Sequence, residues 1–441
     1  MRIPSQTRKS LSTRRLGCAV KAGWRLEVRY FQKPIFVHNT QSHLVSTDGY
    51  QAKMTSQAVD GLRTDHPDDL WLCTSLPITP AGSKPADFPD CWAECFVSAR
   101  AKRAVLNTPG FPEPLPRPTS PDCFRLEESP GRGICMFATR DIRWGDLVLA
   151  ERPLIVTPRA WRPTGPIPKQ FTPKQRQQAL NMQIEKLLEF LMTRLPEESQ
   201  AAFKALSNCH KEDGSGPLGG IVRTNVFRID DYYESQSPGE PDDARFYGGT
   251  FKILSRVNHS CSTNADRSWD SPTFSLQLRA ARDIKKGEEI TLSYIDGLLK
   301  PASDRQRRLR SYGFQCTCQA CVNAKSSDAR RKKILQYLET KPNGSKVFDL
   351  ILEGKKLMDE EGLQSYVAYS EMLSRLVALT RGRATVKPDE GEKEWKMLET
   401  FRLVRRGGRN AETRPRADND AKLQMVQQMI AALAVGQEPL D

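Results

Sequence analysis

Three cysteines stand within six residues, Cys316-Thr-Cys318-Gln-Ala-Cys321, and few other patterns in the chain limit its folding so strongly. Structural zinc is held tetrahedrally by four ligands, so the fourth has to come from another segment. The natural candidate is Cys261, in the polar run Asn258-His-Ser-Cys-Ser-Thr-Asn264. A closed, structural metal there would contribute on the order of 10 kcal/mol to folding. Three reduced surface thiols are the plain alternative, and their readiness to oxidise disfavours it.

The use of cysteine indicates a reducing compartment. Eleven cysteines in 441 residues are too few and too unevenly placed for a disulfide scaffold, and no continuous apolar signal segment opens the chain. The chain is 38% apolar and 27% charged, a globular composition with room for two or three cores. No apolar run approaches the roughly 18 residues that span a bilayer. We therefore expect no membrane-spanning segment and interpret clustered cysteines as metal ligands.

The net charge of +14 is concentrated at the N-terminus. Residues 1–33 contain nine Lys or Arg residues and one acid, Glu27, which places about +8 there. An Arg-rich, Ser-rich and acid-poor start is typical of a mitochondrial transit peptide, and equally of a nuclear signal or a basic nucleic-acid arm. A solvated, flexible end without any targeting function explains this composition as well. Direct nucleic-acid binding therefore stays open.

The chain divides into four regions by pattern. Residues 1–120 have little periodicity and end in a Pro-rich stretch, which predicts a basic, Pro-rich and partly disordered extension. Short strand-like runs follow in residues 121–295, with a helical insert over 163–220, and the cysteine cluster lies in 296–324. Residues 325–441 are predicted to be helical, with a polar loop or disordered stretch from Arg381 to Asp420.

An internal echo indicates a β-rich core. Ala138-Thr-Arg-Asp-Ile-Arg-Trp-Gly145 resembles Ala280-Ala-Arg-Asp-Ile-Lys-Lys-Gly287. Each predicts a strand, a turn whose glycine can take positive φ, and a second strand. Between them, the apolar residues from Gln178 to Leu195 recur at helical spacing, which predicts an amphipathic helix packed on that core.

Two further patterns bear on chemistry, each weak on its own. Gly131-Arg-Gly133 allows a backbone to approach a ligand closely, but it could equally be a hairpin turn. It opens no helix, which disfavours a dinucleotide site. The run from Gly287 predicts a strand that ends at Tyr294, and a single strand tyrosine is more often a core residue than a catalyst.

Taken together and in this order, the glycine pair, Asn258-His-Ser-Cys261, the strand to Tyr294 and the cysteine cluster resemble the SET-domain protein-lysine methyltransferases. Asn-His-Ser-Cys followed by Ser-Tyr294 and Tyr312-Gly-Phe314 is most similar to the branch of SET-and-MYND proteins. The MYND zinc finger of that branch is not expected here, because the Cys-poor insert from Pro163 to Gly220 stands in its place.

The resemblance implies a mainly β SET fold of short sheets with a pseudo-knot, a post-SET zinc segment and a small α-helical C-terminal domain. It implies S-adenosylmethionine against the backbone of Arg132 and Gly133. The other residues that it assigns to the site are Asn225, Asn258, His259 and Phe314 for the cofactor, Tyr294 and Tyr312 for catalysis, and Cys261, Cys316, Cys318 and Cys321 for Zn²⁺.

The reaction that the resemblance implies is methyl transfer to a neutral lysine amine of a histone or another protein. A lysine with pKa near 10.4 is neutral only about one part in a thousand near pH 7.4, a cost of roughly 4 kcal/mol that an aromatic channel would lower. Cys135 replaces a smaller residue of the family, and Thr263 stands where many relatives have Pro. The alternative is therefore a catalytically weak SET module that acts as an interaction or chromatin scaffold. We expect a monomer in the nucleus or cytoplasm, with mitochondrial targeting open.

Overall fold

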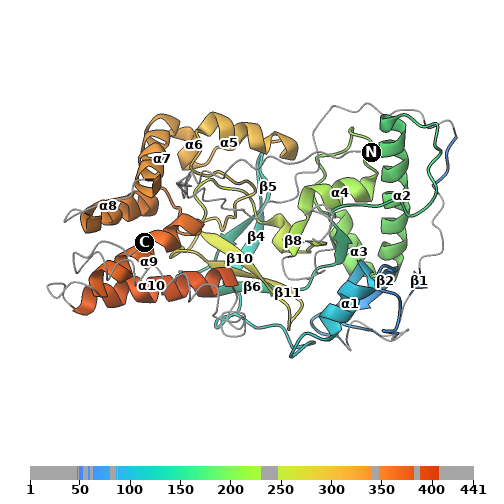
Figure 1. Ribbon diagram of the computed structural model, residues 1–441, viewed down its shortest axis with the longest axis horizontal. Coiled ribbons are helices and arrows are strands. Elements are labelled where there is room, and N and C mark those ends of the chain that lie inside the picture. The colour runs from blue at the N-terminus through green and yellow to red at the C-terminus, as the bar shows by residue number, and fades with distance from the viewer. Residues whose placement is uncertain are drawn as a thin grey trace, which may run out of the picture. The chain divides into compact units, whose positions relative to one another are not determined.

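The computed structural model describes residues 47, 49–52, 58–59, 63–79, 86, 88–229, 247–339, 347–381 and 388–406. All of them belong to one of the chain's two units, Gln32–Asp441. The basic segment 1–33, with the targeting and nucleic-acid predictions made for it, lies outside the described residues. Figure 1 shows the strands in the middle of this unit, with helices on either side of them.

The largest sheet has six strands in the order β1-β2-β3-β7-β9-β8. Its strands are β1 (Ala58–Val59), β2 (Trp71–Leu76), β3 (Ala93–Ser98), β7 (Ile155–Pro158), β8 (Phe227–Ile229) and β9 (Tyr247–Thr250). In this sheet β3 and β7 pair in parallel, and β7 and β9 pair in antiparallel orientation. Ser98 accepts from the Ala101 amide and so caps helix α1 (Ala99–Leu106) directly after β3.

Strands β2 and β3 correct one expectation. Residues 71–106 were expected to belong to the N-terminal extension, and they are part of the core instead. All six residues of β3 are buried, as are five of the six in β2. A strand that is buried on both faces has no polar–apolar alternation, so the period-2 signal is missing from its sequence.

The two repeated Arg-Asp-Ile segments follow strands of two smaller sheets. Strands β4 (Phe124–Ser129) and β5 (Gly133–Ala138) form a hairpin, and β10 (Ala265–Asp270), β11 (Ser275–Ala280) and β6 (Leu147–Glu151) form an antiparallel sheet. The two Arg-Asp-Ile turns pair with each other through a two-way bridge between Ile142 and Ile284.

The contacts of these two turns are reciprocal. Asp283 accepts from the Trp144 amide at 2.8 Å, and Asp141 accepts from the Lys286 amide at 2.9 Å. The amide of Gly145 donates to Ala280, and that of Gly287 donates to Ala138. Both glycines have positive φ, +88° and +82°, as the echo predicts.

The predicted helical insert is present and consists of three helices. They are α2 (Pro173–Arg194), α3 (Glu197–Lys204) and α4 (Pro217–Asn225). A capping box between Thr172 and Gln175 starts α2, which is longer than the predicted helix. Leu187, Leu188 and Leu191 of α2 are fully buried and pack against Phe96 of β3 and neighbouring residues of α3 and α4. The insert therefore covers the six-stranded sheet.

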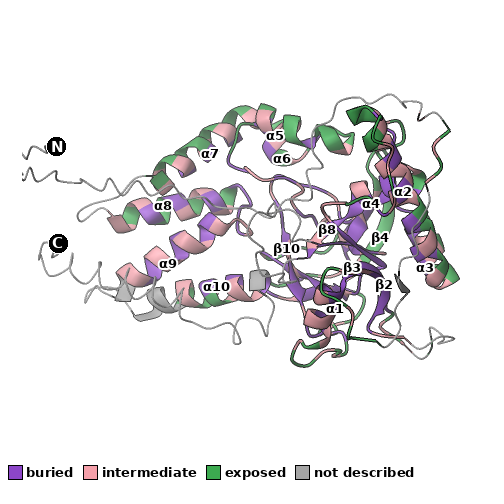
Figure 2. Cartoon of the chain, turned by 45° about the vertical axis from the view of Figure 1, so that its right-hand side comes forward, coloured by how far each residue is buried: buried purple, intermediate pink, exposed green. Residues whose placement is uncertain are grey.

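Helices dominate the chain after the strands. They are α5 (Ala302–Leu309), η4 (Arg310–Tyr312), α6 (Gln319–Val322), α7 (Ala324–Glu339), α8 (Val347–Glu360), α9 (Val367–Arg381) and α10 (Pro388–Arg406), and one short helix, η3 (Leu254–Arg256), lies earlier, between β9 and β10. Figure 2 shows the strands mostly buried, while the outward faces of α2, α3, α5 and α7 carry exposed residues. Within the described residues, no helix combines the length and the apolar character needed to cross a bilayer.

Helix α10 corrects a second expectation, because it lies in the stretch Arg381 to Asp420 that was expected to be a loop or disordered. Leu398, Phe401 and Val404 recur at helical spacing and are buried. The helix packs against α9, β10 and β11. Three buried positions among many charged ones give a weak periodic signal, and tertiary packing supplies most of the stability of such a helix.

Candidate functional site

Four thiols meet where the loop after η3 reaches the turn before α6. The sulfur atoms of Cys261, Cys316, Cys318 and Cys321 all lie within 4.8 Å of one another, and none of the four forms a disulfide. Cys261 and Cys316 are buried, and the other two are half-buried. The structure thus brings residue 261 to the cysteine trio, as the sequence indicates.

The electrostatics of this group favour a cation. The neighbouring thiols raise the pKa of Cys261, and Cys316 has the largest effect. In turn, contact with Cys261 lowers the pKa of Cys318 and lowers that of Cys321 to about 7. Thiolates this close repel one another unless a positive charge lies between them. Four sulfur donors in a compact group fit a soft metal ion in tetrahedral geometry.

Four aromatic rings gather next to the thiol group. The ring of Tyr294 lies 5.1 Å from that of Tyr312, 5.5 Å from that of His259 and 6.3 Å from that of Phe314, between centroids. Tyr312 and Phe314 flank Gly313, whose φ of +72° turns the chain between them. Phe314 remains 39% exposed, so the ring cluster reaches the surface.

The Tyr294 hydroxyl is fixed and neutral. It donates to the carbonyl of Val257 at 2.6 Å, and the Tyr312 hydroxyl donates to the carbonyl of Tyr294 at 3.4 Å. Burial raises the pKa of both phenols well above 10. Both hydroxyls can therefore act as hydrogen-bonding groups at neutral pH, with lone pairs still able to accept.

His259 links the rings to the thiols. Its Nδ1 accepts from the Tyr294 amide at 3.0 Å, and its Nε2 lies 3.3 Å from the sulfur of Cys261. Because a backbone amide can only donate, Nδ1 carries no proton, and the neutral ring donates from Nε2 to the sulfur. Both ring nitrogens are thus committed within the protein. A ligand would meet His259 through its backbone or its ring face.

Asn258 holds the β4–β5 hairpin turn. Its amide nitrogen lies 3.4 Å from the carbonyl of Arg132, 3.1 Å from the sulfur of Cys135 and 3.2 Å from Glu289. Glu289 also forms an ion pair with Arg132, at 2.6 Å. Sequence reasoning did not assign Glu289, although the Gly-Glu-Glu run that contains it was noted.

The glycine pair is the turn of that hairpin, the plain interpretation of the Gly-x-Gly pattern. Gly131 and Gly133 have φ of +73° and +68°, and a Cβ at either would meet no atom within 4 Å. The backbone beside Asn258 therefore faces open space. The Cys135 side chain is itself fully buried.

Asn225 is not brought into the ring cluster by its hydrogen bonds. It ends α4, is buried, and donates from its side chain to the carbonyls of Ser207 and Ile221 at 2.6 and 2.8 Å. Its own carbonyl accepts from Ser255 in η3, just before the Asn258 loop. A cofactor contact for Asn225 stays a prediction.

The expected strand up to Tyr294 is reduced to single bridges. Glu289 bridges to Phe137, and Leu292 bridges in parallel to His259. Asn264 fixes this segment by accepting from the Thr291 amide at 2.8 Å. Residues 258–265 thus run beside 289–292, whereas the full threading of a pseudo-knot stays a prediction.

Comparisons with known proteins match the part of the chain that contains Asn258 and Tyr294. The family model "SET domain" matches residues 133–295. Histone-lysine N-methyltransferase set5 of Schizosaccharomyces pombe is 31% identical over 229 residues, which cover 51% of this chain and 59% of that protein. N-lysine methyltransferase SMYD2 of Homo sapiens is 34% identical over 125 residues, 28% of each chain. The chain thus spans between about a quarter and three fifths of these relatives.

The likeness to solved structures is slight. A chain of "ctPRC2 in an autoinhibited conformation bound to S-adenosylmethionine" matches with a TM-score of 0.19 and 13% identity, over 71% of this chain and 33% of that one. That score is too low to show a common fold. The family model and the curated relatives therefore carry the comparison: residues 133–295 match the SET-domain model, the family that the sequence motifs resemble.

Proposed function

We propose that this protein transfers a methyl group from S-adenosylmethionine to lysine side chains of other proteins. The observation that carries the proposal is the gathering of the Tyr312, His259 and Phe314 rings around the ring of Tyr294, together with the open backbone at Gly133. The SET-domain match and relatives named histone-lysine and N-lysine methyltransferases support it. Because the chain spans only part of those relatives, activity and substrate are proposals.

The rings of Tyr294, Tyr312 and Phe314 would strip water from the target ammonium. A lysine is neutral only about one part in a thousand near pH 7.4, and burial in an aromatic channel favours the neutral amine. The Tyr294 hydroxyl, held by Val257, would accept a hydrogen bond from the amine and aim its lone pair. Tyr312 would line the channel from the other side. No strong general base is then needed.

The cofactor would lie against the hairpin turn. Bound there, S-adenosylmethionine supplies an electrophilic methyl group next to a positive sulfonium. Gly133 and the backbone of Arg132 offer the open wall, Asn258 fixes that wall, and the half-exposed ring of Phe314 would cover the adenine. His259 would contribute its backbone and ring face, and Asn225 a further contact.

The metal is proposed to be zinc, held by Cys261, Cys316, Cys318 and Cys321. Four thiolates with no open ligand position indicate a structural role. His259 would donate to the Cys261 sulfur and thereby hold it in place. The metal would keep the segment of Tyr312 and Phe314 next to the Asn258 loop without taking part in methyl transfer.

The proposed partner is a protein that presents a lysine, with histones as the first substrates to test. This choice follows from the printed name of the fission yeast relative. A nuclear or cytoplasmic location, with chromatin association, is proposed with it.

The test is incubation of the protein with methyl-labelled S-adenosylmethionine and a panel of histones and other proteins. We expect label on lysine, and we expect Tyr294→Phe to lower the rate by about a hundredfold or more through loss of the orienting hydroxyl. Tyr337→Phe is the matched control, because Tyr337 lies on α7 outside the ring cluster. Calorimetry with the cofactor shows whether both variants still bind it.

Two outcomes would count against the enzyme. No label on any substrate together with no cofactor binding would exclude methyl transfer by this chain. Cofactor binding without turnover would favour the scaffold alternative. Equal activity in wild type and Tyr294→Phe would remove Tyr294 from the mechanism.

A further inference from the structure

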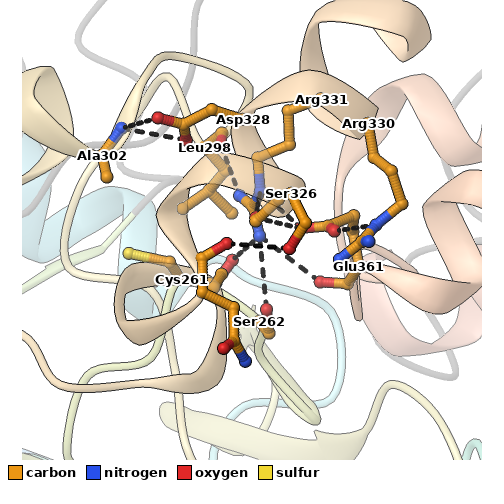
Figure 3. A network of polar contacts seen from close by, with 12 residues as sticks. Cys261, Ser262, Leu298, Ala302, Ser326, Asp328, Arg330, Arg331 and Glu361 are labelled. Atoms are coloured by element: carbon orange, nitrogen blue, oxygen red, sulfur yellow. Dashed lines mark hydrogen bonds and ion pairs between the residues drawn. The ribbon is translucent and has the colours of Figure 1, made fainter.

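A fully buried arginine outside the SET-domain match lies against the loop that carries Cys261. Arg331 belongs to α7, its side chain has 0% exposure, and its ion-pair partner Glu361, just after α8, has 2%. Figure 3 shows the Arg331 guanidinium reaching from its helix into the loop at Cys261 and Ser262. A buried charge is tolerated only where it is paired and hydrogen-bonded, so each contact of this group is informative.

The guanidinium joins three segments. Its Nη2 donates to the carbonyl of Cys261 at 3.0 Å and lies 3.2 Å from the Ser262 hydroxyl. Its Nη1 donates to the carbonyl of Leu298, four residues after Tyr294. Its Nε donates to Glu361 at 2.8 Å. One side chain thus connects the thiol loop, the segment after Tyr294 and the start of the α8–α9 turn.

Two other contacts bring the same turn against the same loop. Gly362 has φ of +64°, and a Cβ there would lie 3.0 Å from the Cβ of Ser262, so the two backbones approach closely. The hydroxyls of Ser365 and Thr263 are 2.6 Å apart. The α8–α9 turn and the loop at Cys261–Thr263 therefore form a close junction.

The junction reaches Tyr294 in two further steps. Cys261, whose carbonyl Arg331 holds, contacts His259 through its sulfur, and His259 accepts from the Tyr294 amide. A displacement of the Cys261 backbone would therefore shift the His259 ring and, with it, the backbone of Tyr294.

We propose that Arg331, oriented by Glu361, is a positioning residue that sets the Asn258–Thr263 loop and the Tyr294 backbone. The effect on methyl transfer rests on the proposed function, whereas the effect on the loop does not. Lysine cannot replace this arginine, because one ammonium cannot form the planar fork of bonds to Cys261, Leu298 and Glu361.

The neighbouring arginine offers a matched control. Arg330 also binds Glu361, at 2.5 Å, from the adjacent position of α7, but it is 37% exposed and lies outside the contacts to Cys261 and Leu298. Arg330→Lys and Arg331→Lys make the same chemical change beside the same carboxylate. They differ in that only Arg331→Lys removes a guanidinium that donates to the carbonyl of Cys261.

The test is hydrogen exchange of the amides of Ser260, Leu292 and Tyr294, whose hydrogen bonds join the loop to the site. For Arg331→Lys we expect exchange to rise by about tenfold or more, because at least one buried hydrogen bond to the loop is lost. For Arg330→Lys we expect a change of less than about twofold, since a half-exposed ion pair contributes little. Equal exchange in the two variants would overturn the proposal.

A second variant serves if Arg331→Lys does not fold. Ser365→Ala removes one neutral hydrogen bond on the far side of the same junction, and we expect about threefold faster exchange at Ser260 with no change in β2 or β3. Unchanged exchange at Ser260 in that variant would likewise overturn the proposal.

A kinetic measurement then separates positioning from folding. In Arg331→Lys the kcat for methyl transfer should fall by about tenfold or more while the KM for the protein substrate stays within about twofold. A variant with faster exchange but wild-type kcat would contradict positioning of Tyr294. If the wild-type protein transfers no methyl group, the exchange result still decides the structural claim.

Discussion

At the scale of single residues, the thiol cluster and the ring cluster depend on each other through His259. The amide of Tyr294 fixes the ring proton on Nε2, which then faces the Cys261 sulfur. The cysteine cluster and the segment that ends at Tyr294 become one site because this side chain contacts both. A substitution that moves the Cys261 sulfur is therefore expected to move the His259 ring and the Tyr294 backbone as well.

The first prediction at this scale concerns Cys318. Cys318→Ser replaces a soft sulfur ligand by a hydroxyl, so zinc content should fall from one per chain and unfolding free energy should drop by several kcal/mol. Elemental analysis and urea unfolding measure the two effects. Cys91→Ser, at an exposed cysteine outside the cluster, should change neither. A folded, reduced preparation without zinc would contradict the metal assignment.

The second residue-scale prediction concerns Glu151 at the end of β6. Burial raises the pKa of this carboxyl to about 7, although the amides of Ile253 and Leu254 donate to it. The folded state therefore holds the proton more tightly than the unfolded state, and this stabilisation is lost as pH rises from about 4.5 to 7. The free energy of unfolding of Glu151→Gln should therefore rise by about 1–3 kcal/mol relative to that of the wild type as pH increases from 5 to 8.

Urea unfolding at the two pH values measures that difference. Glu128→Gln is the control, because Glu128 lies exposed in β4. Parallel pH profiles for Glu151→Gln and wild type would show that Glu151 titrates normally.

At the scale of elements, burial decided which segments could be predicted. The insert helix was predictable because its leucines recur along one face, and the echo because glycine marks both turns. Strands β2 and β3 were not, since strands buried on both faces carry no alternation. The stretch to Tyr294 was predicted as a strand, but it forms only isolated bridges because Asn264 and His259 supply its partners.

The candidate site follows the same pattern. The four thiols could be named because zinc requires four ligands, whereas the three aromatic residues were named only through the family resemblance that the order of the motifs carries. Arg331 and Glu361 could not be named, since a buried ion pair has the same sequence appearance as a solvated one.

Helix α10 provides the prediction at this scale. Phe401→Ala should lower the unfolding free energy by about 3 kcal/mol, because a buried ring between α10 and its neighbours leaves a cavity. Glu399→Ala, two positions away and exposed, should change it by less than about 0.5 kcal/mol. Equal stability of both variants would show that the helix is not docked in solution.

At the scale of the whole molecule, one apolar cluster combines the thiol region with the C-terminal helices. It includes Cys261, Leu298 and Leu309 together with Leu373 of α9 and Phe401 of α10. The SET-domain match ends at residue 295, yet the buried surface around its site continues far beyond that point. The C-terminal helices are thus part of the same core.

A truncation tests this continuity. A chain that ends at Asn323 loses Arg331, Glu361 and helices α7 to α10, which uncovers the apolar residues around Cys261. We expect this chain to lose cooperative unfolding in urea and to expose surface that binds a hydrophobic dye. A sharp transition at the wild-type midpoint would show that the region up to Asn323 folds without those helices.

The reciprocal pairing of the two Arg-Asp-Ile turns bears on how the chain reaches its native state. Ile142 and Ile284 are 142 positions apart in sequence, and each turn receives its backbone bonds from the other. Contacts between such distant positions incur a large loop-closure entropy before they contribute stability, so they slow folding. Refolding of the complete chain should therefore be limited by the encounter of these two turns.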